Sequence, residues 1–416
     1  MSHSHFQLRC IICGRIYAPA QVSYLCPHHG QEGILDVVYD YEALRQQINR
    51  ERLQVNPDHS IWRYRALLPI SPEAPVPPLQ VGWTPLYPAP RLAEGLGLSH
   101  LWVKDDGRNP TASFKDRASA VAVVKAQEAG SEIVTTASTG NAAAALSGLC
   151  ASVGQKSVIF VPQSAPPAKI AQLLAFGSTV LLVQGTYDDA FELCLQAADH
   201  YGWYNRNTGY NPYMTEGKKT ASYEICEQLN WQAPDVVFVS VGDGCIIGGL
   251  HKGLKDLLAL GWIEQMPRLI GVQAEGSNFL AEAWANNEDV LTKAPISAHT
   301  IADSISAGLP RDRLKAMAAV KETQGAYITV SDDEILAAIP ALARGCGVFA
   351  EPAGAAAYAG LVKAVAHNLV APHERVVVLN TGNGLKDVAS VMKGVEAVGT
   401  RPQTIPPTLA AVQQLF

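Results

Sequence analysis

The chain has 416 residues, 48% of them hydrophobic, and a formal net charge of -6. This composition is that of a globular protein with room for two or three domains, and it excludes a disordered chain. The negative charge, without long Lys/Arg runs, argues against binding to nucleic acid or to an anionic membrane. Eight cysteines are few for a disulfide framework, and the N-terminus lacks the apolar segment of a secretory signal. We therefore expect a cytoplasmic protein without a membrane span.

Residues 1–44 carry four side chains spaced like zinc ligands. Cys10 and Cys13 form one pair, and Cys26 and His29 form a second pair farther along. Thiolates and imidazole are the ligands that tetrahedral zinc prefers. We predict a zinc-ribbon-like segment in which a structural zinc ion is the possible metal, because nothing nearby suggests substrate chemistry. The alternative is that these cysteines are spare thiols.

The middle of the chain alternates between two kinds of segment. Residues 41 to about 80 predict a charged helix, a loop and a Pro-rich connector. Beyond residue 100, apolar β-branched runs alternate with Ala/Leu-rich helical runs; the strand-like runs are 101–103, 133–134, 158–161, 180–183, 236–241, 269–272 and 376–379. Such alternation predicts an α/β fold with parallel sheets flanked by helices.

Lys115 is the leading candidate for catalysis. It lies in the run Asn-Pro-Thr-Ala-Ser-Phe-Lys-Asp-Arg at 109–117, directly before the apolar helical run 118–124. A primary amine held near a pocket can form a Schiff base with an aldehyde cofactor and then move protons at carbon. Arginine and histidine cannot do this, but an isolated lysine is usually a solvated charge, so the prediction depends on further motifs.

Three such motifs follow predicted strands. The turn at 136–142 opens an Ala-rich helix whose free N–H groups suit a substrate carboxylate. The strand 236–241 leads into 242–249, where glycines let the backbone close around a phosphate. The strand 375–379 is followed by Asn380 and Thr381. Thr381 places a hydroxyl beyond the strand's carboxyl end, where open α/β sheets bind ligands.

In this order the motifs resemble those of the fold-type II pyridoxal phosphate enzymes, and among them most closely the threonine synthases. The resemblance also includes the stretches 82–86, 211–220, 351–356 and the ending Thr-Gly-x-Gly-Leu-Lys-Asp at 381–387. It implies a tryptophan synthase β-like fold with two parallel-sheet domains. A large cofactor-binding domain would comprise 45–119 and 211–416, and a small domain 120–210. Cofactor and substrate would lie between them, and the family analogy implies a homodimer.

The resemblance also assigns roles to individual residues. Lys115 would attach the cofactor and remove the Cα proton, Asn141 would bond the ring hydroxyl, and Thr381 would face the pyridine nitrogen. The cofactor phosphate would meet the backbone of Gly242, Asp243, Gly244, Cys245, Ile246 and Ile247. Asp243 departs from the usual asparagine, and we expect it to turn outward and cap the following helix. His29 likewise stands where the family's ribbon usually has cysteine.

Threonine synthase activity implies a small amino-acid substrate, O-phosphohomoserine, which reacts with water to give threonine and phosphate. Its recognition would involve the residues Ser138, Thr139, Gly140, Asn141, Lys218, Lys219 and Arg117. The segment 302–308 departs from the family, because Ser306 replaces the usual arginine and Asp303 is similar to a residue of the threonine and serine dehydratases. The alternative is another type II reaction: cysteate synthase-like β-replacement, or ammonia elimination from threonine, serine or diaminopropionate. A catalytically silent cofactor-binding protein is disfavoured by the intact Lys115 and Asn141.

Overall fold

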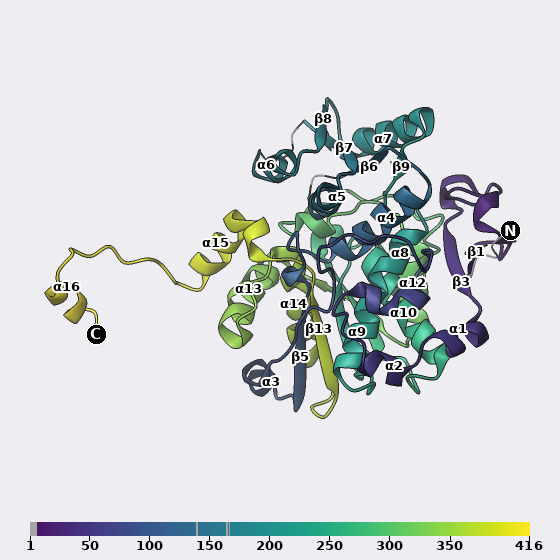
Figure 1. Ribbon diagram of the computed structural model, residues 1–416. Coiled ribbons are helices and arrows are strands. Elements are labelled where there is room, and N and C mark those ends of the chain that lie inside the picture. The colour runs from purple at the N-terminus through teal and green to yellow at the C-terminus, as the bar shows by residue number, and fades with distance from the viewer. Residues whose placement is uncertain (1–5, 139, 164, 166) are drawn as a thin grey trace.

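The computed structural model describes residues 6–138, 140–163, 165 and 167–416 (Figure 1). Within them the strands form three sheets, with the orders β2-β1-β3, β12-β11-β10-β13-β5-β4 and β8-β7-β6-β9. The predicted α/β fold is confirmed. No helix among these described residues is long and apolar enough to cross a membrane.

The N-terminal sheet is a small antiparallel ribbon. Its strands are β1 (Phe6–Cys10), β2 (Ile16–Tyr17) and β3 (Leu35–Tyr39), and the short helices η1 (Pro19–Gln21) and η2 (Gly30–Glu32) lie between them. β1 alternates buried and exposed residues, so Leu8 and Cys10 point into the protein. The ribbon lies at the side of the main body in Figure 1, beside α12 and α10.

The segment after the ribbon is packed rather than free. α1 (Tyr41–Gln47) is capped by Asp40, whose side chain accepts the N–H groups of Glu42 and Ala43, and α2 (Arg50–Gln54) follows. The helix η3 (Ile61–Leu67) buries most of its side chains. The predicted helix after residue 40 is therefore present, and the predicted loop before the Pro-rich connector contains a helix that belongs to the core.

The six-stranded sheet is the centre of the larger part. Its strands are β4 (Leu86–Pro88), β5 (His100–Asp105), β10 (Val236–Ser240), β11 (Arg268–Ala274), β12 (Ala326–Val330) and β13 (Arg375–Asn380). All neighbours are parallel except the edge strand β4, which is antiparallel to β5. The interior strand β10 is buried on both faces, which explains its continuous apolar sequence.

Helices surround this sheet on both faces. They are α3 (Pro90–Leu96), α4 (Lys115–Glu128), α8 (Tyr213–Lys218), α9 (Thr220–Gln228), α10 (Cys245–Leu260), α11 (Phe279–Asn286), α12 (Arg313–Glu322), α13 (Asp332–Cys346), α14 (Pro352–Ala366) and α15 (Val388–Ala397), with the short turns η4 (Asp106–Arg108), η5 (Glu275–Ser277), η6 (Asp303–Ile305) and η7 (Gly384–Lys386). After α15 the chain runs away from the body to α16 (Leu409–Gln413) (Figure 1).

The four-stranded sheet forms a smaller part, at the top of Figure 1. Its parallel strands are β6 (Ile133–Ala137), β7 (Lys156–Pro162), β8 (Thr179–Val183) and β9 (Tyr204–Asn205), and its helices are α5 (Asn141–Ser152), α6 (Pro167–Ala175) and α7 (Tyr187–Tyr201). These strands come from within residues 120–210.

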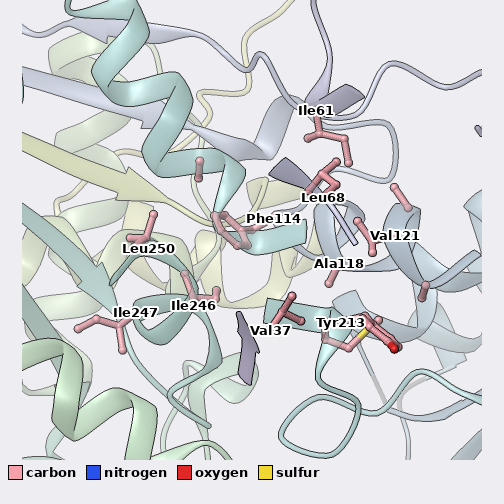
Figure 2. Packing of buried hydrophobic residues seen from close by; sticks show 14 of the residues in the cluster. Val37, Ile61, Leu68, Phe114, Ala118, Val121, Tyr213, Ile246, Ile247 and Leu250 are labelled. Atoms are coloured by element: carbon pink, nitrogen blue, oxygen red, sulfur yellow. The ribbon is translucent and has the colours of Figure 1, made fainter. Parts of the chain in front are cut away.

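A single hydrophobic cluster joins the ribbon to the helices of the body. Figure 2 shows Val37 of β3 in the same cluster as Phe114, Ala118 and the α10 residue Ile246. Glycines allow the helices to approach closely: a Cβ on Gly217 of α8 would clash with the Arg117 carbonyl oxygen of α4. The α4–α8–α10 layer therefore fixes where the first residues of α4 and α10 lie.

Candidate active site

A cavity of about 620 Å³ lies where strands of both larger sheets end. Ala137 at the end of β6, Ser240 at the end of β10 and Thr381 just after β13 all line it. The carboxyl ends of parallel strands are the usual ligand-binding edge of an α/β sheet. The volume lies within the range of roughly 300–1,000 Å³ that is typical of small-molecule sites.

Lys115 is the first residue of α4 and lines this cavity. The preceding loop is tied to the end of β13, because the Phe114 N–H donates to the Thr381 carbonyl oxygen at 2.9 Å. Burial lowers the pKa of Lys115, and the positive charge on Arg206 acts in the same direction. A lowered pKa raises the fraction of free amine, which is the nucleophilic form.

The start of α5 forms one polar wall. Its N-cap, Gly140, provides no side-chain cap, so the first N–H groups of the helix face a cavity that Ser138, Gly140 and Asn141 line. Asn141 donates through Nδ2 to Glu351 Oε1 at 2.7 Å, which fixes its orientation across the cavity. Thr139 lies outside the described residues.

The start of α10 forms a second polar wall. Its N-cap is Gly244, with φ of +86° and no side-chain cap. A Cβ on Gly242 would lie 2.7 Å from Ile305 Cα, so a side chain at this position is sterically excluded. Gly242, Gly244, Cys245, Ile246 and Ile247 all line the cavity. The uncapped N–H groups and the helix dipole together favour an anion here.

Asp243 lines the cavity, but the prediction that it caps α10 is wrong. Its Oδ1 accepts the Arg311 N–H at 3.3 Å, and its carbonyl oxygen accepts the Asp312 N–H at 2.9 Å. Asp243 therefore holds the loop before α12, and the positive end of α10 has no carboxylate cap.

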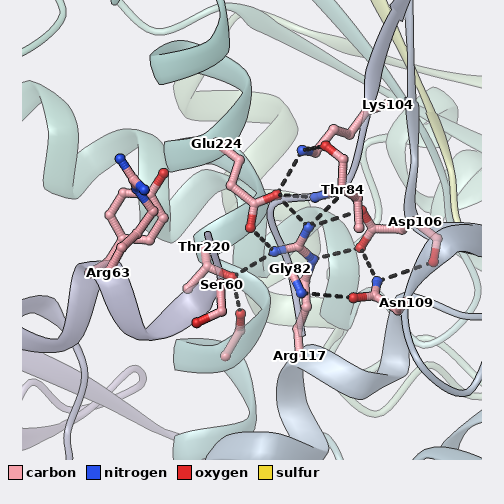
Figure 3. Close-up of polar contacts among 12 residues, drawn as sticks. Ser60, Arg63, Gly82, Thr84, Lys104, Asp106, Asn109, Arg117, Thr220 and Glu224 are labelled. Carbon is pink, nitrogen blue, oxygen red and sulfur yellow. Dashed lines mark hydrogen bonds and ion pairs between the residues drawn. The ribbon is translucent and has the colours of Figure 1, made fainter. Parts of the chain in front are cut away.

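Arg117, predicted to bind the substrate, does not line the cavity and is fully buried. Figure 3 shows its guanidinium between two carboxylates, Asp106 at 2.6 Å and Glu224 at 2.5 Å. Lys104 also contacts Glu224, at 2.7 Å. Burial alone would raise the pKa of Glu224, but the two cations outweigh it and lower that pKa to about 2. The structure thus gives Arg117 a place in a buried ion-pair network that joins η4, α4 and α9.

Lys218, the last residue of α8, and the following Lys219 have different surroundings. Lys219 pairs with Glu216 at 2.6 Å and Asp256 at 2.7 Å, away from the cavity. Lys218 is fully buried, and its Nζ has no hydrogen-bond partner among the described residues. It lies behind the first turns of α10, where a Cβ on Gly249 would approach its Cβ to 2.6 Å. Burial lowers the pKa of Lys218 to about 7.

Arg206 lines the cavity and was not among the predicted site residues. It follows the two-residue strand β9, and only 1% of it is exposed. Its Nε donates to Ser119 Oγ at 3.1 Å and its Nη1 to Thr208 Oγ1 at 3.0 Å. No local pattern marked this residue, because an arginine after a very short strand resembles any surface loop residue.

The four predicted zinc ligands come together in the ribbon. Ligand atoms of Cys10, Cys13, Cys26 and His29 lie within 4.8 Å of one another, and Cys26 Sγ is 3.5 Å from His29 Nδ1. Burial acts to raise the pKa of Cys26, but hydrogen bonds with Tyr17 and His29 lower it to about 6. Three sulfur atoms and one ring nitrogen are a donor set that fits tetrahedral zinc.

Comparison with known proteins identifies the family. A family model described as "Pyridoxal-phosphate dependent enzyme" matches residues 78–382. The threonine synthase of Methanocaldococcus jannaschii is 38% identical over 93% of this chain and 95% of the relative. The threonine synthase of Methanosarcina acetivorans is 39% identical over 93% and 94%. The chain belongs to the threonine synthases of the pyridoxal phosphate-dependent enzyme family.

Solved structures of this family show the same fold. Threonine deaminase isoform 2 from Solanum lycopersicum has a TM-score of 0.64 and 24% identity, over 76% of this chain and 83% of that chain. Diaminopropionate ammonia lyase from Escherichia coli has a TM-score of 0.65 and 18% identity, over 82% and 94%. The predicted fold-type II architecture and the predicted dependence on pyridoxal phosphate are confirmed.

The cavity of this threonine synthase family member fits pyridoxal phosphate. The cofactor has an aldehyde, a phosphate, a ring hydroxyl and a ring nitrogen. The cavity offers a half-buried amine at Lys115, an uncapped helix start at Gly244, an amide at Asn141 and a hydroxyl at Thr381. The glycine at 242 and the unpartnered Lys218 behind α10 also favour a phosphate at that helix.

Proposed function

We propose that this protein is a threonine synthase that converts O-phosphohomoserine and water to threonine and phosphate. The observation that carries the proposal is a cavity that joins the amine of Lys115 to two uncapped helix N-termini, in a chain whose threonine synthase relatives align over nearly its whole length. The reaction makes the protein a lyase that acts on the bond between carbon and the phosphate oxygen.

Each wall of the cavity has a role in this reaction. Pyridoxal phosphate supplies an electron sink that stabilises negative charge on the substrate's carbon atoms. Lys115 holds the cofactor through its Nζ and then moves protons at Cα. The N–H groups at the start of α10 bind the cofactor phosphate, and Lys218 behind them adds positive charge. The N-terminus of α5, with Ser138 and Asn141, binds the substrate carboxylate.

Thr381 and Asn141 orient the cofactor ring. The Thr381 hydroxyl is neutral and faces the pyridine nitrogen. It therefore makes the ring less electron-withdrawing than a carboxylate at the same place would. Asn141 is held by Glu351 and bonds the ring hydroxyl from the α5 side. These contacts favour chemistry on the β and γ carbons, as loss of a γ-phosphate requires.

The decisive experiment mixes the cofactor-loaded protein with O-phosphohomoserine. We expect inorganic phosphate and threonine to form in equal amounts, measured by phosphate assay and chromatography with mass detection. A protein that holds its cofactor but releases neither product would contradict the proposal.

A second candidate is another type II β-replacement or elimination reaction. Asp303 and Ser306 both line the cavity, and neither contributes positive charge for a phosphorylated substrate. O-phosphoserine, threonine, serine and diaminopropionate are the substrates to compare. Turnover of one of these above that of O-phosphohomoserine would favour this candidate.

We further propose that the N-terminal segment, residues 1–44, holds a structural zinc ion. Residues 45–119 and 211–416 together form the large domain, and residues 120–210 form the small domain. The protein is a cytoplasmic homodimer. The clustered Cys and His side chains support the zinc ion. The eight cysteines, none of them in a disulfide bond, support the cytoplasmic location. The family resemblance supports the dimer. Metal analysis and light scattering of the purified protein test the zinc and the dimer.

A further inference from the structure

Arg206 differs from the other deeply buried arginines of this chain. Arg63 pairs with Glu227, Arg117 with Asp106 and Glu224, and Arg313 with Glu32. Arg206 is as buried as these, yet it has no carboxylate partner among the described residues, and its Nη2 has no hydrogen-bond partner there. Burying an arginine without a direct ion pair is costly, so this chain retains a buried charge that no ion pair among the described residues compensates.

The surroundings of Arg206 increase this cost. The positive charge of Arg206 acts to lower the pKa of both Lys115 and Lys218. Burial lowers the pKa of Arg206 itself to about 10. The hydroxyls of Ser119 and Thr208 hold Nε and Nη1, Nη2 is buried without a hydrogen-bond partner among the described residues, and Arg206 lines the cavity. A guanidinium held by neutral groups is pre-organised to bind a phosphate or a carboxylate.

The ligand of Arg206 can be identified by matching the anionic groups of the substrate and the cofactor to the anion-binding places of the cavity. O-phosphohomoserine carries a carboxylate and a phosphate, and the cofactor carries a second phosphate. Among the described residues, the cavity has three places for anions that no carboxylate already occupies: the start of α5, the start of α10 backed by Lys218, and Arg206, whereas Arg311 is paired with Asp188. The uncapped N–H groups of α10 suit the cofactor phosphate and those of α5 suit the carboxylate, which leaves Arg206 for the substrate's phosphate.

We propose that Arg206 binds the phosphate of the substrate through its guanidinium and thereby sets the preference for phosphorylated amino acids. The inference rests on the proposed function, because it takes O-phosphohomoserine as the substrate. Thr208 is a positioning residue that orients the guanidinium.

The test compares Arg206→Gln and Arg206→Lys with the wild type. The ligand is a phosphonate analogue of O-phosphohomoserine that cannot lose its phosphorus group, and its binding to the cofactor-loaded protein is followed by absorbance. We expect Arg206→Gln to weaken analogue binding about 10- to 100-fold, the loss typical of a charge-assisted hydrogen bond. Homoserine, which lacks the phosphate, should bind both proteins equally, and Arg206→Lys should recover part of the affinity.

Arg311→Gln is the matched comparison. Arg311 also lines the cavity, but it already pairs with Asp188 at 2.9 Å, so we expect less than about a threefold change in analogue binding. A second measurement titrates the cofactor-free Arg206→Gln protein with pyridoxal phosphate. An unchanged affinity for pyridoxal phosphate supports the assignment of Arg206 to the substrate phosphate. A lost affinity for pyridoxal phosphate with unchanged analogue binding overturns this assignment and shows that Arg206 binds the cofactor phosphate. Circular dichroism shows that the variants are folded.

The outcomes separate this inference from the proposed function. If the wild type makes threonine and Arg206→Gln keeps the wild-type KM, the inference fails and the function stands. If the wild type binds the analogue through Arg206 but makes no threonine, the function fails and the phosphate-binding role stands.

Discussion

At the scale of single residues, the buried charges of this protein fall into two groups. Arg117, Lys104 and Lys219 lie within 2.8 Å of carboxylates and stabilise the packing of helices and strands. Arg206 and Lys218 have atoms without partners among the described residues and lie at or behind the cavity. Since an unpaired buried charge is destabilising, its persistence indicates a ligand.

Lys115→Ala removes the amine that is proposed to hold the cofactor. We expect borohydride treatment to link the cofactor to the wild type, seen as a mass increase, and not to the variant. Turnover should fall by at least about 1,000-fold, because both attachment and proton transfer are lost. Lys125→Ala changes another lysine of α4 that pairs with Glu128 and lies outside the cavity, so it should keep wild-type turnover. Full activity of Lys115→Ala would refute the mechanism.

We expect Lys218 to make cofactor binding depend on pH. Its pKa is about 7 in the folded protein against the ordinary lysine value of 10.5 in the unfolded chain, so between these values the unfolded chain binds a proton that the folded protein lacks. This group's contribution to stability therefore rises with pH from 7 to 10.5 in the cofactor-free protein. A phosphate beside Lys218 raises its pKa again, so binding at about pH 8 takes up a proton and weakens as pH rises.

Calorimetry in buffers of different ionisation enthalpy measures that proton. We expect Lys218→Met to take up less of a proton than the wild type at about pH 8, and its cofactor affinity to vary less between about pH 7 and 9. Lys255→Met, a change at a partly exposed lysine of α10, serves as control. Equal proton uptake in all three proteins would show that Lys218 does not face the phosphate.

The sequence predicted some site residues better than others for a physical reason. Lys115, Asn141 and Thr381 lie at strand or helix ends, where local sequence determines position, and all three line the cavity. Arg117 lies only two residues from Lys115, but on a helix it points to another side, where Asp106 and Glu224 bind it. Arg206 depends on long-range packing against Ser119, which no local pattern contains.

At the scale of elements, the strands with a continuous apolar sequence were predictable, including the exposed edge strand β8, whereas β9 and β12 were not. The interior strand β10 and its neighbour β13 are continuous apolar runs, because helices cover both faces of the sheet. β12 is an edge strand with half-buried residues, and β9 has only two residues, so neither was apparent from its own sequence. The strands β9 and β12 are defined by their partners rather than by their own residues.

Two glycine substitutions should have opposite effects on stability, because only one of them lies in the close packing of α8, α9 and α10. A Cβ on Gly253 of α10 would clash with the Lys219 carbonyl oxygen, so Gly253→Ala should destabilise the protein by about 1–3 kcal/mol through overpacking. Gly95 in α3 is exposed, and a Cβ there meets nothing within 4 Å. Gly95→Ala should stabilise by about 0.5–1 kcal/mol. Urea unfolding of both variants measures the difference, and equal effects would contradict the packing.

At the scale of the whole molecule, the ribbon is joined to the catalytic body by buried polar contacts. The Tyr39 hydroxyl donates to Glu216 Oε2 at 2.7 Å, and Lys252 Nζ donates to the Val37 carbonyl oxygen at 2.7 Å. Glu216 belongs to α8 and Lys252 to α10, the two helices behind the phosphate end of the cavity. None of the described ribbon residues lines the cavity itself. The ribbon can therefore support these helices without touching the substrate.

Removing the ribbon's metal should consequently lower stability more than catalysis. Cys26→Ser breaks the proposed zinc site, and we expect it to lose bound zinc and at least about 1 kcal/mol of stability, a fall of roughly 2–4 °C in Tm for a domain of 150–250 residues. The kcat below the unfolding transition should stay within about threefold of the wild type, because the proposed mechanism depends on Lys115 and the two helix starts. Cys346→Ser, outside the ligand cluster, is the matched control and should keep its zinc. If Cys26→Ser instead lost activity at unchanged Tm, the contacts of Tyr39 and Lys252 would transmit the state of the ribbon to the cavity, and the zinc would have a regulatory role.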